Sequence, residues 1–161
     1  MGDYRERAIA TGTGLVIRHA PATIHEVAAW PGANSALEHF LNAYGSGARN
    51  PLLRVGPGRV WVVGADTLEL QTATNGMALI DLSHALVRIQ VSGESARLVL
   101  RKGLPVDLHP SVFPDGSIAT SAIERIVVTV HNNGDSFDLF CRRSYSGSLE
   151  HWLADASIFL L

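Results

Sequence analysis

The chain has 161 residues, of which 47% are hydrophobic, and a formal net charge of −2 from 13 basic and 15 acidic side chains. A chain of this length suits one domain that buries roughly 70% of its unfolded surface, so disorder is not expected, and the balanced charge excludes a strong field for nucleic acid or anionic lipid. Its single cysteine, Cys141, excludes an internal disulfide and agrees with a cytoplasmic location, and no apolar run reaches the roughly 18 residues of a membrane span.

The first twenty residues are expected to form a flexible N-terminal arm, followed by a single domain over residues 21–161. Gly12 and Gly14 interrupt a weak apolar stretch that also carries three arginines. A secretory signal would need a continuous apolar segment, which is missing here. Because glycine adds conformational freedom, the sequence favours a flexible arm over a signal peptide.

The first half of the domain predicts strands with one helix between them. Residues 22–30 and 59–63 are rich in β-branched and aromatic side chains, and residues 51–55 form a short extended piece. Apolar side chains that recur every three or four residues predict a helix over residues 33–44. For residues 66–74, a short helix and a loop both stay open.

The second half repeats this order. Alternation over residues 83–91 predicts a strand with one buried face, and a helix is expected over 93–102. Two extended runs within 118–131, the hairpin turn 132–135 and a return strand over 137–141 follow. The last helix is predicted over 145–156.

Both halves therefore read as a strand, a glycine, a helix, a glycine and further strands. This order predicts an α/β (α+β) fold with two ferredoxin-like β-α-β units. These units are expected to form a mixed, mostly antiparallel sheet with helices packed on it.

The motifs of common active sites are missing from the sequence. The seven histidines are scattered singly, with no His-x-x-x-His pair, and no Gly-x-Ser-x-Gly elbow occurs. Ser83 and His84 are neighbours on a predicted strand, so their side chains point to opposite faces. Cys141 shares a strand face with Phe137 and Leu139, which predicts a buried, inert thiol. No catalytic, cofactor-binding or metal-binding residue is assigned.

Two polar segments have similar sequences, Asp81-Leu82-Ser83-His84 and Asp107-Leu108-His109-Pro110. In one interpretation their side chains fix the backbone at the ends of strands and helices. In the other, Asp81, Ser83, His84, Asp107 and His109 build a polar pocket. Both interpretations stay open.

Candidate interface residues lie at the C-terminal end. Tyr145 is one, and Phe159, Leu160 and Leu161 form an apolar end that no charged residue follows. Such an end is poorly suited to solvent, so we expect it to pack on a partner or on a second copy of the chain. Trp61 and Trp152 are expected to fill the core instead.

Several segments together resemble one protein family, the sarcosine oxidase gamma subunit family. They are Asp81–Ala85, Val91–Gly93, Lys102–Pro110, Phe113–Gly116, Phe137–Leu139, Arg143–Tyr145 and the Leu149-x-x-Trp152-Leu153 pattern. The resemblance covers residues 77–156 well and 22–64 loosely. It implies a fold similar to the first part of an aminomethyltransferase-type folate-binding domain.

The resemblance also implies a function. The chain would be a non-catalytic assembly subunit of a heteromeric sarcosine oxidase-like complex, with alpha, beta and delta subunits as partners. Those subunits would use FAD, FMN, NAD and tetrahydrofolate to demethylate sarcosine and transfer the one-carbon unit. Alternatives are a stand-alone folate-binding or one-carbon-transfer domain, with Asp81 as its polar anchor, or a small subunit of a related N-methyl amino acid or opine oxidase.

Overall fold

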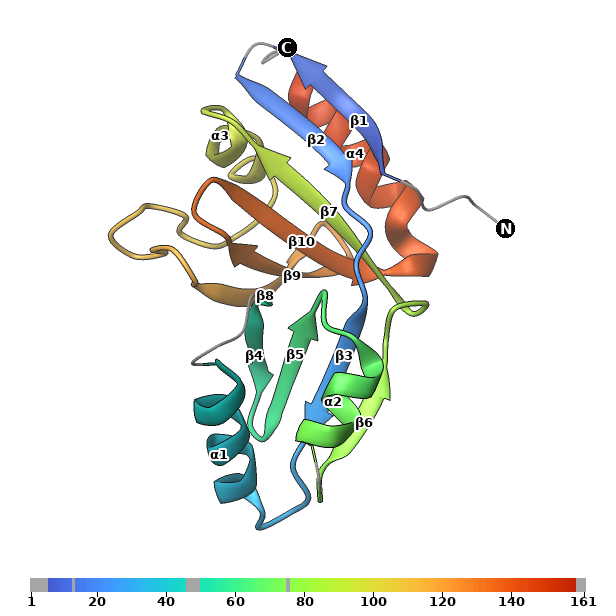
Figure 1. The fold of residues 1–161 in the computed structure, drawn as a ribbon. Coiled ribbons are helices and arrows are strands. Elements are labelled where there is room, and N and C mark those ends of the chain that lie inside the picture. Colours follow the sequence, from blue (N-terminus) through green and yellow to red (C-terminus); the bar gives the residue numbers. More distant parts are fainter. Residues whose placement is uncertain (1–5, 13, 46–49, 75, 159–161) are drawn as a thin grey trace. The chain divides into compact units, whose positions relative to one another are not determined.

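The computed structural model describes residues 6–12, 14–45, 50–74 and 76–158 (Figure 1). The chain divides into two compact units. Residues 22–84 form the first, which we call the inserted unit. The residues before and after them form the second, which we call the split unit.

The inserted unit is a four-stranded antiparallel sheet with two helices on one face. The sheet order is β4-β5-β3-β6, so β3 and β4 lie on either side of β5 and run in the same direction. This is the ferredoxin-like β-α-β-β-α-β motif, which confirms that part of the prediction. Its elements are β3 (Ile24–Ala28), α1 (Asn34–Gly45), β4 (Leu52–Gly56), β5 (Arg59–Val63), α2 (Thr67–Ala73) and β6 (Ala78–Asp81).

The core of the inserted unit lies between the helices and the sheet. Leu37 and Phe40 of α1 and Leu70 of α2 pack against one face of β3 and β5. Alternation along each strand places Val27, Val60 and Val62 on that face. Asp66 caps the N-terminus of α2, because its Oδ1 accepts hydrogen bonds from the backbone N–H groups of Leu68 and Glu69.

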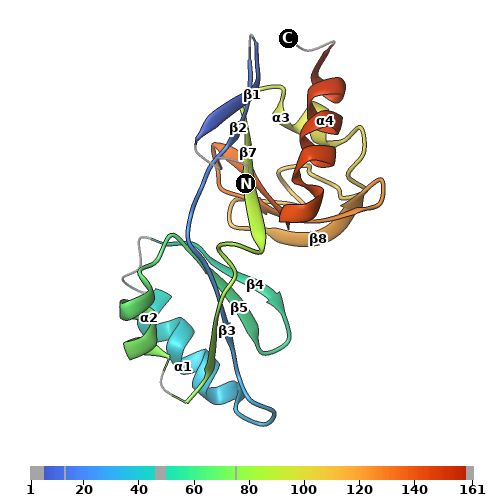
Figure 2. The same cartoon turned by 90° about the vertical axis from the view of Figure 1, so that its right-hand side faces the viewer.

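The split unit is a six-stranded antiparallel sheet in the order β1-β2-β7-β10-β9-β8, with α3 and α4 packed on it (Figure 2). A single 3₁₀ turn over Arg143–Tyr145 precedes α4. The elements are β1 (Arg7–Gly12), β2 (Leu15–His19), β7 (Leu86–Ser92), α3 (Ala96–Leu100), β8 (Ile118–Ile123), β9 (Ile126–Asn132), β10 (Ser136–Arg142) and α4 (Ser146–Ser157).

The core of the split unit joins alternate sheet residues to both helices. Ile17, Ile89 and Leu139 come from three neighbouring strands and are fully buried. They pack with a group of apolar side chains from the helices: Val99, Leu100, Leu149 and Leu153.

The N-terminal residues differ from the expected flexible arm. Residues 7–12 and 15–19 pair as strands β1 and β2 at one edge of the six-stranded sheet. Leu15 and Ile17 alternate into the core, and Gly14 has a φ of 78° where the chain turns between the two strands. Gly14 therefore serves a tight turn, which the sequence pattern does not distinguish from a flexible segment.

The α+β class and the antiparallel pairing are confirmed, but the described strands form two sheets instead of one. The strand–glycine–helix segments of the two halves belong to different units. The second segment does not continue as a ferredoxin-like unit, because β8 after α3 pairs with β9 and not beside β7. All three predicted helices are present, although α3 is shorter than expected.

Candidate functional site

The first polar segment organises its own backbone. Asp81 Oδ1 accepts a hydrogen bond from the N–H of Ser83 at 2.8 Å, and Ser83 Oγ accepts one from the N–H of Ile24 at 3.0 Å. Hydrogen bonds from the Ser83 side chain and backbone lower the pKa of Asp81, which keeps the acceptor ionised. These contacts hold the end of β6 against the start of β3. His84 is exposed.

The second polar segment uses the same arrangement. Asp107 Oδ1 accepts a hydrogen bond from the N–H of His109 at 2.9 Å, and His109 Nδ1 lies 2.7 Å from Ser111 Oγ. Asp107 and His109 belong to the split unit, whereas Asp81, Ser83 and His84 belong to the inserted unit. Each segment shows an Asp side chain that accepts a hydrogen bond from the backbone N–H two residues later.

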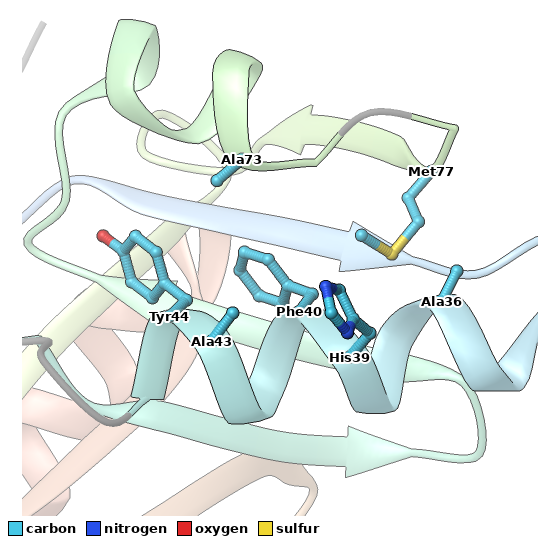
Figure 3. A pocket seen from close by; sticks show the side chains of 7 residues that line it. All are labelled: Ala36, His39, Phe40, Ala43, Tyr44, Ala73 and Met77. Carbon is cyan, nitrogen blue, oxygen red and sulfur yellow. The ribbon is translucent and has the colours of Figure 1, made fainter.

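An apolar groove of about 400 Å³ lies between α1, α2 and Met77 (Figure 3). Phe40 and Tyr44 stack along it with ring centroids 5.2 Å apart and planes 17° apart. Burial raises the pKa of Tyr44, so its phenol stays protonated. The groove suits an apolar group, and its polar side chains are few. The residues that line it are Ala36, His39, Phe40, Ala43, Tyr44, Ala73 and Met77.

A smaller and more polar pocket of about 270 Å³ lies at α3 and the second polar segment. Arg97 and Arg101 line it together with Asp107, Leu108, His109 and Pro110. Of these, only Asp107 and His109 were candidates from the sequence. For Arg97 and Arg101, the sequence signal is their i, i+4 spacing at a predicted helix.

A buried polar network crosses the face of the six-stranded sheet that α3 and α4 do not cover. Arg88 donates to Asp138 Oδ2 at 2.8 Å, and Gln90 donates to Asp138 Oδ1 at 3.2 Å and accepts from Arg18. Burial by itself raises the pKa of Asp138, but the neighbouring His131, Arg88 and Gln90 side chains outweigh it and leave this pKa lowered. The sequence does not predict this network, because its members lie on four strands and meet only through the register of the sheet.

The Cys141 thiol is buried, as the strand pattern predicts. Burial raises its pKa to about 11, so the thiolate that would act as a nucleophile is scarce at neutral pH. Among residues 6–12, 14–45, 50–74 and 76–158, no group of three His, Cys, Asp or Glu side chains could hold a metal ion. Within the same ranges, no helix has the length and apolar character to cross a membrane.

The candidate interface residues are exposed where they are described. Tyr145 is 49% exposed, and Ile158, which directly precedes the apolar C-terminal residues, is 59% exposed. Phe159, Leu160 and Leu161 lie outside the described residues. Trp61 is buried and Trp152 packs against the core of the split unit, as expected.

Comparisons with known proteins agree on one family. The model of the family described as "Sarcosine oxidase, gamma subunit family" matches residues 50–159. The sarcosine oxidase subunit gamma of Corynebacterium sp. (strain U-96) is 32% identical over 154 residues, which cover 92% of this chain and 66% of that protein. The subunit of the same name from Corynebacterium sp. (strain P-1) is 28% identical over 163 residues, 96% of this chain and 80% of that protein. This chain therefore spans slightly less than two thirds of the first of these relatives.

A solved structure is similar over nearly the whole chain. A chain of the heterotetrameric sarcosine oxidase from Corynebacterium sp. U-96, in complex with pyrrole 2-carboxylate, superposes with a TM-score of 0.77 at 27% identity. The match covers 92% of this chain and 86% of that chain. The similarity thus extends over both units and is not confined to the polar segments.

Proposed function

Because the chain belongs to the sarcosine oxidase gamma subunit family, we propose that it is a non-catalytic assembly subunit of a heteromeric sarcosine oxidase-like complex. One observation supports this most strongly. The fold matches a chain of a heterotetrameric sarcosine oxidase over 92% of its length, with a TM-score of 0.77. A match of that extent supports a shared fold over both units, and not merely a shared motif.

The partners in this proposal are larger subunits of the alpha and beta type, with a delta subunit as a further member. By resemblance, FAD, FMN, NAD and tetrahydrofolate serve the chemistry in those subunits, and no residue of this chain is proposed to hold them. The whole complex would oxidise sarcosine and pass the one-carbon unit to tetrahydrofolate. Its proposed location is the cytoplasm, which agrees with the unpaired Cys141.

Co-expression with the cognate large subunits tests the proposal. The full chain should co-purify with them in a complex of defined stoichiometry on size-exclusion chromatography, and the complex should oxidise sarcosine. The chain purified alone should neither oxidise sarcosine nor retain flavin. An isolated chain with a flavin spectrum, or one that releases peroxide with sarcosine, would contradict the proposal.

Folate binding separates the proposal from the stand-alone alternative. An assembly subunit should show no saturable tetrahydrofolate binding when it is isolated. Isothermal titration of the isolated chain with tetrahydrofolate measures this directly. Saturable binding that weakens in the Asp81→Ala variant would favour a folate-binding domain with Asp81 as its anchor.

A further inference from the structure

The guanidinium group of Arg97 is held in a defined position beside the pocket at α3. Its Nε donates a hydrogen bond to the carbonyl oxygen of Leu108 at 3.1 Å. Its central carbon lies 5.1 Å from the centroid of the Phe137 ring, which is a cation–π distance. These two contacts leave the terminal nitrogens of Arg97 available at the pocket, and a fixed guanidinium loses little entropy when it binds a carboxylate.

Arg101 directly follows α3 with helical backbone and lies one turn after Arg97, so the two side chains lie on the same side of the helix end. Within the part of the chain that the structure describes, neither makes an ion pair. Five other arginines of this part do have acidic partners: Arg7 with Glu150, Arg18 with Glu6, Arg54 with Glu38, Arg59 with Glu26 and Arg88 with Asp138. The two arginines thus place two positive charges at the pocket, and neither has an ion-pair partner among the described residues.

The remaining lining residues limit what the pocket can accept. Asp107 contributes one carboxylate, whose Oδ1 already accepts the N–H of His109. Two guanidinium groups and one carboxylate leave a net charge of +1 when His109 is neutral. Such a site suits one singly charged anion better than a multiply charged phosphate. Its volume of about 270 Å³ is below the roughly 300–1,000 Å³ of most small-molecule sites, so it suits a side chain.

Exposed apolar side chains lie next to the pocket residues in the sequence. Leu98 of α3 is 50% exposed, and Val112, two residues after Pro110, is 61% exposed. A protein interface typically combines arginines and apolar side chains in this way at its centre. A free metabolite would gain little from apolar groups outside the pocket.

We propose that the Arg97–Arg101 pocket receives an Asp or Glu side chain of a partner subunit and so anchors this chain in its complex. The proposal rests on the proposed function, because it assumes a heteromeric assembly. It adds the position of one contact and the chemistry of the partner group. Two arginines offer paired N–H donors that match the two oxygens of a carboxylate, which gives the contact direction as well as charge.

Binding of the full chain to the purified large subunits tests this contact. Arg101→Gln and the double variant Arg97→Gln/Arg101→Gln are compared with the unchanged chain by biolayer interferometry at about 50 and 300 mM salt, since screening weakens exposed charge pairs. The expected loss of affinity is about fivefold for the single variant and at least about tenfold for the double variant at low salt. The differences should shrink at high salt.

Two further variants serve as controls. Arg125→Gln removes an exposed arginine between β8 and β9 of the same unit, which makes no ion pair among the described residues, and should change affinity less than about twofold. Asp107→Asn keeps the acceptor for the His109 N–H and removes the negative charge, so binding should stay equal or become tighter. Thermal melting of each free variant checks that it is folded, and Arg101→Gln removes no side-chain hydrogen bond or ion pair within the described residues.

The outcomes are distinct. If the unchanged chain binds the large subunits and the folded double variant binds with the same affinity, this inference is overturned and the proposed function stays intact. No complex with the normal chain would refute the proposed function and this inference with it. Weaker binding by Asp107→Asn would also overturn the inference, because it would mean that the pocket binds a positively charged or zwitterionic group.

Discussion

Asp138 and Arg88 form a buried ion pair between strands β10 and β7 of the split unit. Arg88 Nη2 donates to Asp138 Oδ2 at 2.8 Å, and the Asp138 side chain is 1% exposed. The second carboxylate oxygen accepts from Gln90, and His131 Nδ1 lies 3.7 Å from Oδ2. A charge so deeply buried is stable only while its partners remain.

Replacing Asp138 by alanine should destabilise the split unit strongly. The change leaves the partly buried Arg88 without its counter-charge, and breaking a buried pair typically costs about 3–5 kcal/mol. Urea unfolding followed by circular dichroism measures the loss. Asp155→Ala is the control, because Asp155 is an exposed acid on α4, and its effect should be much smaller. Equal effects of the two changes would show that the Asp138 network contributes little.

The same carboxylate should make stability depend on acid. The pKa of Asp138 is lowered in the folded chain from its ordinary value of 3.8, so its contribution is complete above that value. It is lost as the pH falls through the lower, folded pKa, because the unfolded chain then binds the proton more readily. Melting temperatures measured from pH 6 down to pH 2 should fall less steeply for Asp138→Ala than for the unchanged chain. Parallel curves would contradict the assignment.

Gly93 should tolerate no side chain. Its φ is 100°, and a Cβ built there would overlap the carbonyl group of Gly14, which belongs to the β1–β2 turn. Gly93→Ala combines backbone strain with a backbone clash, and we expect a cost of about 3 kcal/mol or more. Gly116 has a similar φ of 82° with no atom near its Cβ position, so Gly116→Ala should cost only about 1–2 kcal/mol. Urea unfolding of both variants measures the difference, and equal losses would exclude the clash as a cause.

Asp81 should affect assembly more than chemistry. Its side chain bonds to the Ser83 N–H, and a hydrogen bond of this kind contributes about 1 kcal/mol. Asp81→Ala should lower the yield or melting temperature of the complex and leave the turnover per intact complex unchanged. Asp107→Ala removes the equivalent bond in the other unit and provides a comparison. A loss of turnover above about a hundredfold with assembly intact would assign Asp81 a chemical role.

The helices and central strands follow from local patterns. Residues 33–44 show a helical apolar period and form α1, and Arg59–Val63 is dense in β-branched residues and forms β5. The local pattern does not predict β1, β2 and β6, because all three are short, and β1 and β6 are also partly exposed. Their pairing is decided by neighbouring strands, which no local window contains.

In the candidate site, too, local features can be predicted from the sequence, and features that depend on strand pairing cannot. The bonds from Asp81 and Asp107 to the backbone two residues later are local, and the residue types indicate them. The Asp138 network depends on sheet register, since Arg88 and Asp138 are 50 positions apart in the sequence. The pocket likewise combines α3 with a loop after it, so its arginines were not singled out from the sequence.

The inserted unit contains two similar ion pairs that differ in burial, Glu26–Arg59 and Glu38–Arg54. Glu26 is 8% exposed and accepts from Arg59 Nε at 3.0 Å and Nη2 at 2.7 Å, and from Trp61 Nε1 at 3.0 Å. Glu38 and Arg54 form an equally good bidentate pair in which both side chains are more than half exposed. Glu26→Ala leaves the buried Trp61 N–H without this acceptor, which should cost about 1–3 kcal/mol. Glu38→Ala leaves only the exposed Arg54 guanidinium, which water solvates, and should leave the urea midpoint nearly unchanged. Tryptophan fluorescence follows both transitions, and a shift as large for Glu38→Ala as for Glu26→Ala would contradict the argument that burial sets the value of these pairs.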